Sequence, residues 1–343
     1  MNGCGALLRA RRAWTLVFGE REEHMNAEAL AAMGAPPGRM PGATAEAIFR
    51  LACAGAATLL LAALGGVVVS LAIGGWPAFQ NFGFGFLTSS EWNPVTEVYG
   101  AAGPIVGTMV TALLALIIAL PLAVGVSVFL VEFCPVRFSR PIAIAVELLA
   151  GIPSIVYGMW GLFVLAPWFA AHVQMPLMVN ATPGGWMETL FYGVPNGANI
   201  FTASLILAIM ILPYMAAVFR ELFLTVPAQV REAAYGLGCT PFEVTGSVLI
   251  PYVRRGAIGV IMLGLGRALG ETMAVTFIIG NAHGFPHSLF DSGSTIASTI
   301  ANEFAEATSD MHSAALIALG LVLFFITFAV LATARALLRE ARS

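Results

Sequence analysis

Two charged residues stand inside an apolar stretch near residue 270, and their types suit the handling of an anion. Arg267 is a permanent cation, and Glu271 follows it four residues later in the run G-R-A-L-G-E-T-M-A-V. Residues four apart lie on one face of an α-helix, so this spacing predicts an adjacent pair. An arginine can bind an oxyanion, while a nearby carboxylate can orient it and weaken its affinity enough for release. The alternative is a structural ion pair whose charges only neutralise each other.

A polar segment at 220–255 lies between two apolar stretches and carries a second pattern. Its distinctive residues are Glu232, Ala233, Ala234, Gly238 and, after the apolar Val248 and Ile250, Pro251. Pro227 suits the first turn of a short helix, and the run T-P-F-E from Thr240 predicts the capped start of another. Glycine at 236 and 238 favours a sharp joint between the two helices.

This polar segment has two interpretations. The first is a docking surface, on which Ala233 and Ala234 form a small, smooth patch that another protein can approach, with Glu232 beside them. The second is an ordinary amphipathic helix lying on the membrane. The fixed distances from Glu232 to the glycine and proline favour the docking surface.

The composition places these patterns in a membrane protein. Of 343 residues, 59% are hydrophobic and 10% are charged, far below the charge content of soluble domains. All basic residues are arginine, which excludes a phosphate-binding G-K-[ST] loop, so any ATP must be bound by another chain. The net charge of −3 gives no support for a nucleic-acid partner. No catalytic, metal-binding or cofactor motif is present, and the sequence predicts a transport subunit and not an enzyme.

Hydropathy predicts six transmembrane helices, because about 20 apolar residues cross the hydrocarbon core. The expected spans are 51–74, 101–131, 141–171, 200–219, 256–282 and 314–334. Residues 1–48 are expected to form a disordered N-terminal tail, and residues 49–340 one transmembrane permease domain.

Arginine placement predicts the orientation. Every arginine except Arg267 falls in the N-terminal tail, the loops after the second and fourth spans, or the C-terminal tail. Because positive charge is retained in the cytoplasm, both termini are expected there. The opposite loops carry acidic residues and no arginine.

The segment from Glu232 to Pro251 resembles the E-A-A loop of ABC importer permeases, and other motifs narrow the resemblance. They are S-S-E-W-N-P at 89–94, G-I-P-S-I-V-Y-G at 151–158, G-R-A-L-G-E-T-M-A-V at 266–275 and I-G-N at 279–281. Together they are similar to the PstC-type permease of phosphate-specific importers, from about Leu51 to the last span.

The resemblance implies a type I ABC importer permease in a bacterial inner membrane. Its implied partners are a PstA-type second permease, two copies of a PstB-type ATPase and a PstS-type extracytoplasmic phosphate-binding protein, together with membrane lipid. Two alternatives stay open. One is an ABC permease for another oxyanion, and the other is a secondary transporter or channel that uses Arg267 and Glu271.

Overall fold

The described part of the chain is built from helices that suit a membrane. The computed structural model describes residues 43–180, 185 and 190–340, so most of the expected tail at 1–48 lies outside the described residues. Within those residues, six helices are long and apolar enough to cross a membrane, which confirms the all-α membrane fold. They are Ala45–Phe82, Ala102–Phe133, Ser154–Asn180, Ile200–Leu224, Pro241–Leu269 and Asp310–Ala336.

The chain divides into two units, Met1–Gly66 and Val67–Ser343, and the boundary falls inside helix α2. This helix is Ala43–Phe82, so it begins before residue 49, where the sequence placed the start of the permease domain. In the first unit, the side chains at 45–66 are exposed and almost all apolar, as a lipid-facing helix requires. The second unit contains the remaining helices.

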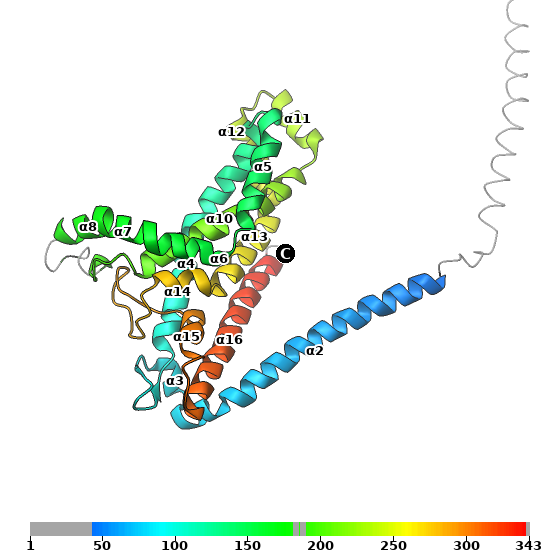
Figure 1. Ribbon diagram of the computed structural model, residues 1–343. Helices are drawn as coiled ribbons and strands as arrows, with labels where there is room; N and C mark the ends of the chain where they lie inside the picture. The colour runs from blue at the N-terminus through cyan, green and yellow to red at the C-terminus, as the bar shows by residue number, and fades with distance from the viewer. Residues whose placement is uncertain (1–42, 181–184, 186–189, 341–343) are drawn as a thin grey trace, which may run out of the picture. The chain divides into compact units, whose positions relative to one another are not determined.

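The core of the second unit forms around α10 (Ile200–Leu224). In its most apolar window 67% of the residues are buried, more than in any other span of the described chain. Helix α4 (Ala102–Val128) runs beside α10, and α13 (Ile250–Leu269) packs on both (Figure 1). Buried alanines along α4 allow this close approach. The Ser127 hydroxyl also donates to the Ala216 carbonyl at 2.8 Å, which ties α4 to α10.

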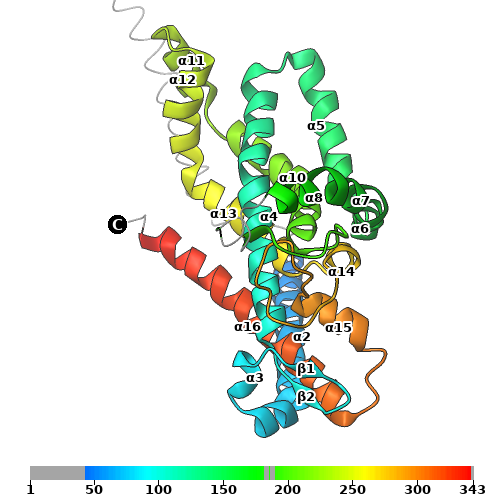
Figure 2. The same ribbon diagram turned by 90° about the vertical axis from the view of Figure 1, so that its left-hand side faces the viewer.

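The third span begins later than the sequence predicts. The chain first forms α5 (Val136–Ala150), which returns antiparallel to α4 in Figure 2 and packs against α10. Pro153 then has φ −57° and ψ 135°, outside the helical region. Proline also disfavours helix in the residue before it, so Gly151-Ile152-Pro153 separates two helices.

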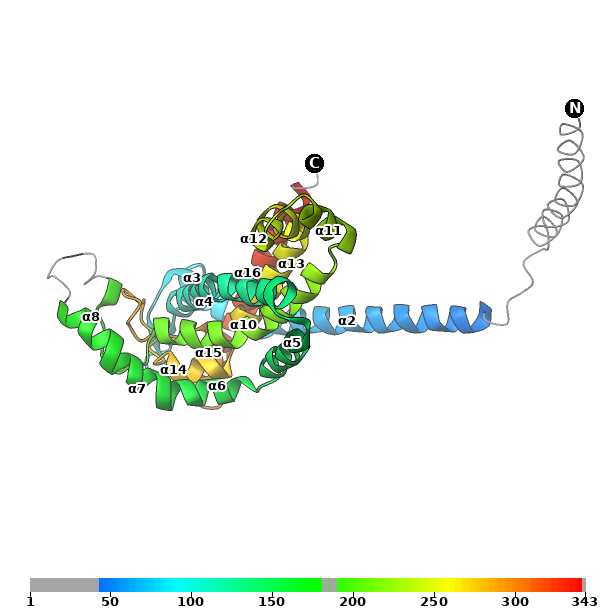
Figure 3. The ribbon, with the colours of Figure 1, turned by 90° about the horizontal axis from the view of Figure 1, so that it is seen from above.

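The third span itself is the run Ser154–Asn180. It contains α6 (Ser154–Trp160), α7 (Ala166–Phe169) and α8 (Met175–Asn180), joined by π-helical turns. These pieces follow one another along a curve in Figure 3. The extra residue in each π-helical turn interrupts the regular hydrogen bonding, which allows the helix to bend.

The fifth span begins and ends earlier than the predicted 256–282. The helical run starts with α12 (Pro241–Val244), passes through a π-helical turn at Thr245–Leu249 and continues as α13 to Leu269. Pro251 explains the turn, because it lacks an N–H and its ring crowds the preceding turn of helix. After Leu269 the chain leaves the helix and forms the short α14 (Met273–Ile278).

Small elements gather around the start of α16 (Asp310–Glu340). Strands β1 (Trp92–Asn93) and β2 (Val98–Tyr99) form an antiparallel hairpin next to α3 (Gly85–Thr88) (Figure 2). A separate apolar cluster lies here and includes Ala78, Phe86, Tyr99, Ala315 and Leu319. Helix α15 (Ile296–Glu303) precedes α16, and its N-terminus is capped by Thr295.

Candidate functional site

The loop between α10 and α13 folds into two short helices joined at Gly238. The first is α11 (Ala228–Gly236), and Gly238 after it has φ +87°, which an L side chain rarely adopts. Its N–H donates to the Tyr235 carbonyl at 2.9 Å, and the Cys239 N–H donates to the Ala234 carbonyl at 3.2 Å. These two bonds form a Schellman ending of α11. The joint expected from the glycines is therefore present at Gly238.

The second short helix has the start that the sequence predicts. The Thr240 side chain accepts from the Glu243 N–H, while the Glu243 carboxylate accepts from the Thr240 N–H at 2.7 Å. This reciprocal pair is a capping box. It fixes the direction in which the chain leaves Gly238 and enters the long run toward α13, so the loop has a defined shape.

The exposed tip of this loop is more apolar than its sequence pattern suggests. Leu237 is 86% exposed and Phe242 is 81% exposed, one on each side of Gly238. Glu232 and Ala233 are also exposed, but Ala234 is buried in the main core cluster. The expectation that both alanines form an outer patch is therefore wrong for Ala234, because that side of α11 faces the core. Leu237 and Phe242 were missed because their exposure depends on the joint.

A buried carboxylate attaches α11 to the membrane helices. Glu132 lies in the π-helical turn Phe129–Phe133 that continues α4, and its side chain is 2% exposed. Arg231 pairs with Glu132 at 2.5 Å, and the Tyr235 hydroxyl donates to the same carboxylate at 2.7 Å. Glu132 was not among the residues expected to be functional. Its only signal in the sequence was a single acidic residue at the end of an apolar span.

Arg267 and Glu271 do not form the predicted pair on one helical face. Arg267 lies in the last turn of α13, and the helix ends at Leu269, so Glu271 stands in the non-helical link to α14. Gly270 ends the helix with φ −94° and ψ 3°, which changes the direction of the chain. Among the described residues, no ion pair joins the two side chains. The spacing rule failed because it requires a continuous helix.

Each member of this pair has its own surroundings. Arg267 is exposed, and its guanidinium lies 5.8 Å from the centre of the Tyr214 ring on α10. Its place at the C-terminal end of α13 also suits a cation, because the helix dipole is negative there. Glu271 accepts a hydrogen bond from the Ala274 N–H at 3.3 Å, at the start of α14. Within the described part of the chain, Arg267 contacts the Tyr214 ring and forms no ion pair.

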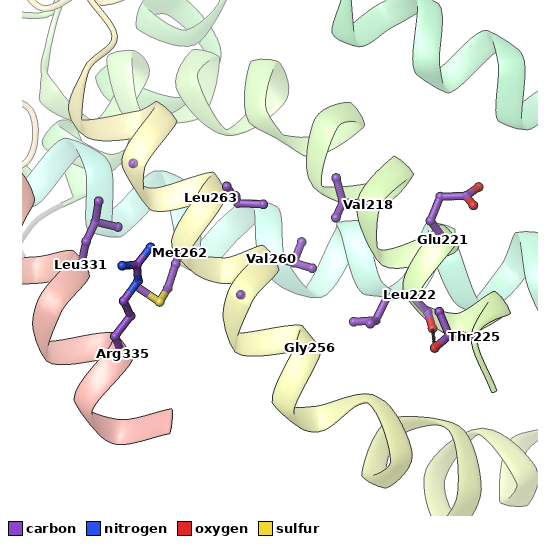
Figure 4. A pocket seen from close by; sticks show the side chains of 12 residues that line it. Val218, Glu221, Leu222, Thr225, Gly256, Val260, Met262, Leu263, Leu331 and Arg335 are labelled. Carbon is purple, nitrogen blue, oxygen red and sulfur yellow. Dashed lines mark hydrogen bonds between the residues drawn. The ribbon is translucent and has the colours of Figure 1, made fainter. Parts of the chain in front are cut away.

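An apolar groove of about 780 Å³ lies between α10, α13 and α16 (Figure 4). Val218 and Leu222 come from α10, Val260 and Leu263 from α13, and Leu331 from α16. None of the predicted site residues lines this groove. Its apolar walls suit contact with apolar helices or lipid, not the binding of a polar solute.

A partly buried carboxylate organises the elements around the start of α16. Glu303 accepts hydrogen bonds from Trp92 Nε1 at 2.6 Å and from His283 and His312, each through Nε2 at 2.8 Å. Burial raises the pKa of Glu303, but the bonds from the two histidines and Trp92 outweigh it and hold the pKa below its usual range. One carboxylate thus ties the β-hairpin, the loop before α15 and α16 together.

Glu303→Gln should lower the melting temperature of the purified protein at pH 7. Losing one charged acceptor for three donors should cost about 2 kcal/mol. Because the folded pKa of Glu303 is lowered, its stabilisation is complete above the ordinary carboxyl pKa and is lost as pH falls through the folded value. The difference from the parent should therefore shrink in strong acid. Glu306→Gln, at an exposed neighbour, is the control. Equal melting temperatures for parent and Glu303→Gln at pH 7 would contradict this role.

Comparison with known proteins places these features in a family. The sequence profile of the binding-protein-dependent transport system inner membrane components matches residues 129–343, which include the whole segment from Glu232 to Pro251. A phosphate transport system permease protein PstC from Mesorhizobium japonicum is 54% identical over 299 residues, covering 86% of this chain and 90% of that protein. The PstC of Pasteurella multocida is 51% identical, over 85% of this chain and 91% of the relative.

A solved structure agrees on the fold. A bacterial ABC transporter involved in the import of the acidic polysaccharide alginate superposes with a TM-score of 0.52 at 15% identity, covering 82% of this chain and 95% of that one. Permeases of ABC importers are non-enzymatic and work with a separate ATPase and a binding protein. The chain belongs to the binding-protein-dependent transport system inner membrane components and, within them, to the PstC-type permeases of the inner membrane.

Proposed function

We propose that this permease carries inorganic phosphate inward at the expense of ATP hydrolysed by another chain. The main support for phosphate as the substrate is the 54% identity to a protein named as a phosphate permease, over 86% of this chain and 90% of that protein. The proposed assembly contains a PstA-type second permease, two PstB-type ATPases and a PstS-type phosphate-binding protein. ATP-dependent phosphate uptake by the reconstituted assembly tests this function.

We propose Arg267 as the residue that guides the anion and Glu271 as the residue that limits how tightly it is held. Arg267 is the one arginine inside the six spans expected from hydropathy, and the loops on the proposed outer side have none. A charged side chain within an apolar membrane segment is costly unless it faces protein or water, so an exposed Arg267 at the end of α13 calls for a polar path or a partner chain beside it. Glu271 lies near Arg267 in sequence but acts here without a direct ion pair.

We propose that the loop from Glu232 to Pro251 is the site at which the ATPase docks. The support is its shape: Gly238 makes a sharp joint, and Leu237 and Phe242 project beside it as apolar anchors. Exposed apolar side chains of this size favour burial in a partner. Glu232 and Ala233 extend the same surface, Ala234 holds α11 to the core, and Pro251 sets the start of α13.

We propose that residues 1–48 form a cytoplasmic tail, that 49–340 form the permease domain, and that both termini are cytoplasmic. The distribution of arginines supports this orientation, because positive charge is retained on the cytoplasmic side. It places the docking loop in the cytoplasm, where ATP is available, and Glu303 outside. The acidic residue Glu188, on the same proposed outer side, lies outside the described residues.

Labelling of single cysteines should establish this topology. In a cysteine-free background, Glu306→Cys should react with a membrane-impermeant maleimide in intact cells, whereas Gln229→Cys on α11 should react only after permeabilisation. Both positions are exposed, so the labelling depends on which side of the membrane each position faces and not on burial. The reverse pattern would place the docking loop outside and refute the orientation.

A further inference from the structure

We propose that Glu132 is a positioning residue that holds the docking helix α11 on the neighbouring end of α4, so that movement of the docked loop reaches the membrane helices. This inference rests on the proposed docking function of the loop. It adds a residue outside the Glu232 to Pro251 segment, 100 positions before Glu232 in the sequence.

The contacts of Glu132 attach the end of α4 to α11. Its carboxylate is 2% exposed and is held by Arg231 at 2.5 Å and by the Tyr235 hydroxyl at 2.7 Å. Both partners lie on α11, one turn apart, whereas Glu132 continues α4. Burial, followed by the hydrogen bond to Glu132 and its charge, raises the pKa of Tyr235, so the hydroxyl keeps the proton it donates at neutral pH.

The partners of Glu132 flank the surface proposed for docking. Arg231 immediately precedes the exposed Glu232, and Tyr235 is two residues before the exposed Leu237. A partner that contacts Glu232 and Leu237 therefore binds the helix whose inner side is attached to Glu132. Any displacement of α11 must either break this attachment or move the end of α4.

Helix α4 continues the connection across the second unit. Ser127, five residues before Glu132, is bonded to α10 through the Ala216 carbonyl at 2.8 Å. At the far end of α4, the Thr108 hydroxyl accepts from the Ile296 N–H at 2.9 Å, at the start of α15. At 1.5 Å per residue, the 27 residues of α4 span about 40 Å. The attachment at Glu132 thus acts on a helix that reaches the proposed outer side.

The test uses the complete importer in proteoliposomes and measures phosphate uptake, ATP hydrolysis and the yield of assembled complex. Glu132→Gln keeps a similar shape but loses the ion pair. It should lower the phosphate imported per ATP hydrolysed about tenfold, because one charge-assisted hydrogen bond contributes about that much. The yield of assembled complex should stay near the parental value. Glu221→Gln is the control, because Glu221 is 66% exposed and pairs with the adjacent Arg220 on the same helix. Uptake that falls only in proportion to yield would make Glu132 merely structural and overturn the proposal.

Variants of the two partners of Glu132, Tyr235 and Arg231, keep the test decisive if Glu132→Gln fails to assemble. Tyr235→Phe removes one hydroxyl from a side chain that is 38% exposed, and it should lower the same ratio, whereas Tyr252→Phe on α13 should not. Arg231→Lys keeps the charge and should retain more coupling than Arg231→Gln. Equal ratios for Tyr235→Phe and the parent would refute the link.

The behaviour of the parental complex shows whether a negative result contradicts the role of Glu132 or the proposed transport of phosphate. A parent that imports no phosphate contradicts the proposed function, and the link is then judged from ATP hydrolysis alone. In the parent, hydrolysis should depend on the added binding protein. In Glu132→Gln this dependence should be lost, and an unchanged dependence would overturn the role of Glu132.

Discussion

Arg267→Gln should reduce phosphate uptake by roughly 100-fold while the complex still assembles, because the amide keeps hydrogen-bonding capacity but loses the charge that attracts the anion. Arg267 forms no ion pair within the described residues, and its side chain is exposed. Its removal therefore strands no buried carboxylate in this part of the chain. Uptake of labelled phosphate, normalised to the amount of assembled complex, measures the effect.

Three variants show whether the effect belongs to Arg267. Arg335→Gln removes an exposed arginine from α16 and should leave uptake near the parental rate. Glu271→Gln should reduce uptake less than Arg267→Gln does, since the Glu271 carboxylate accepts a single hydrogen bond from Ala274. A double Arg267→Gln/Glu271→Gln variant that transports at the parental rate would show that the anion passes elsewhere.

Gly238→Val should weaken association with the ATPase, and ATP-coupled uptake with it, by roughly tenfold, because a β-branched residue is strained at φ +87°. No neighbouring atom lies within 4 Å of the position of the added Cβ, so the effect comes from the backbone and not from crowding. The straightened joint would move Leu237 away from Phe242. Copurification of the ATPase with the tagged permease measures the association.

The matched control for this change is Gly125→Val. Gly125 also has open space around its Cβ position but lies in helix α4, outside the docking loop and without a positive φ, so valine should be tolerated. Glu232→Arg tests the same surface by charge reversal and should also reduce copurification. If Gly238→Val and Glu232→Arg both retained the ATPase and transported normally, the docking assignment would be refuted.

Local rules predicted the parts of this fold that depend on neighbouring residues. The six apolar helices followed from hydropathy, and the capping box at Thr240 followed from residue types at fixed spacing. The left-handed joint at Gly238 also followed, because few residues other than glycine adopt it. In each case the information lies within a few residues of the feature.

Predictions that depend on where each helix ends were less accurate. The spacing of Arg267 and Glu271 predicts one helical face, but the helix breaks at Gly270. Hydropathy does not detect this break, because the apolar run continues through it. The third span was drawn through Pro153 for the same reason. The link from Glu132 to α11 could not be predicted, because it joins residues about 100 positions apart that meet only after the loop folds back.

The most direct test of the central claim is uptake of labelled phosphate by proteoliposomes that contain this permease with its PstA-type and PstB-type partners. ATP is enclosed on the ATPase side, and the PstS-type binding protein is added on the other. Uptake should require ATP, the ATPase chain and the binding protein, and excess unlabelled phosphate should suppress it while sulfate does not. Uptake of sulfate in place of phosphate, or phosphate uptake driven by an ion gradient without ATP, would contradict the assignment.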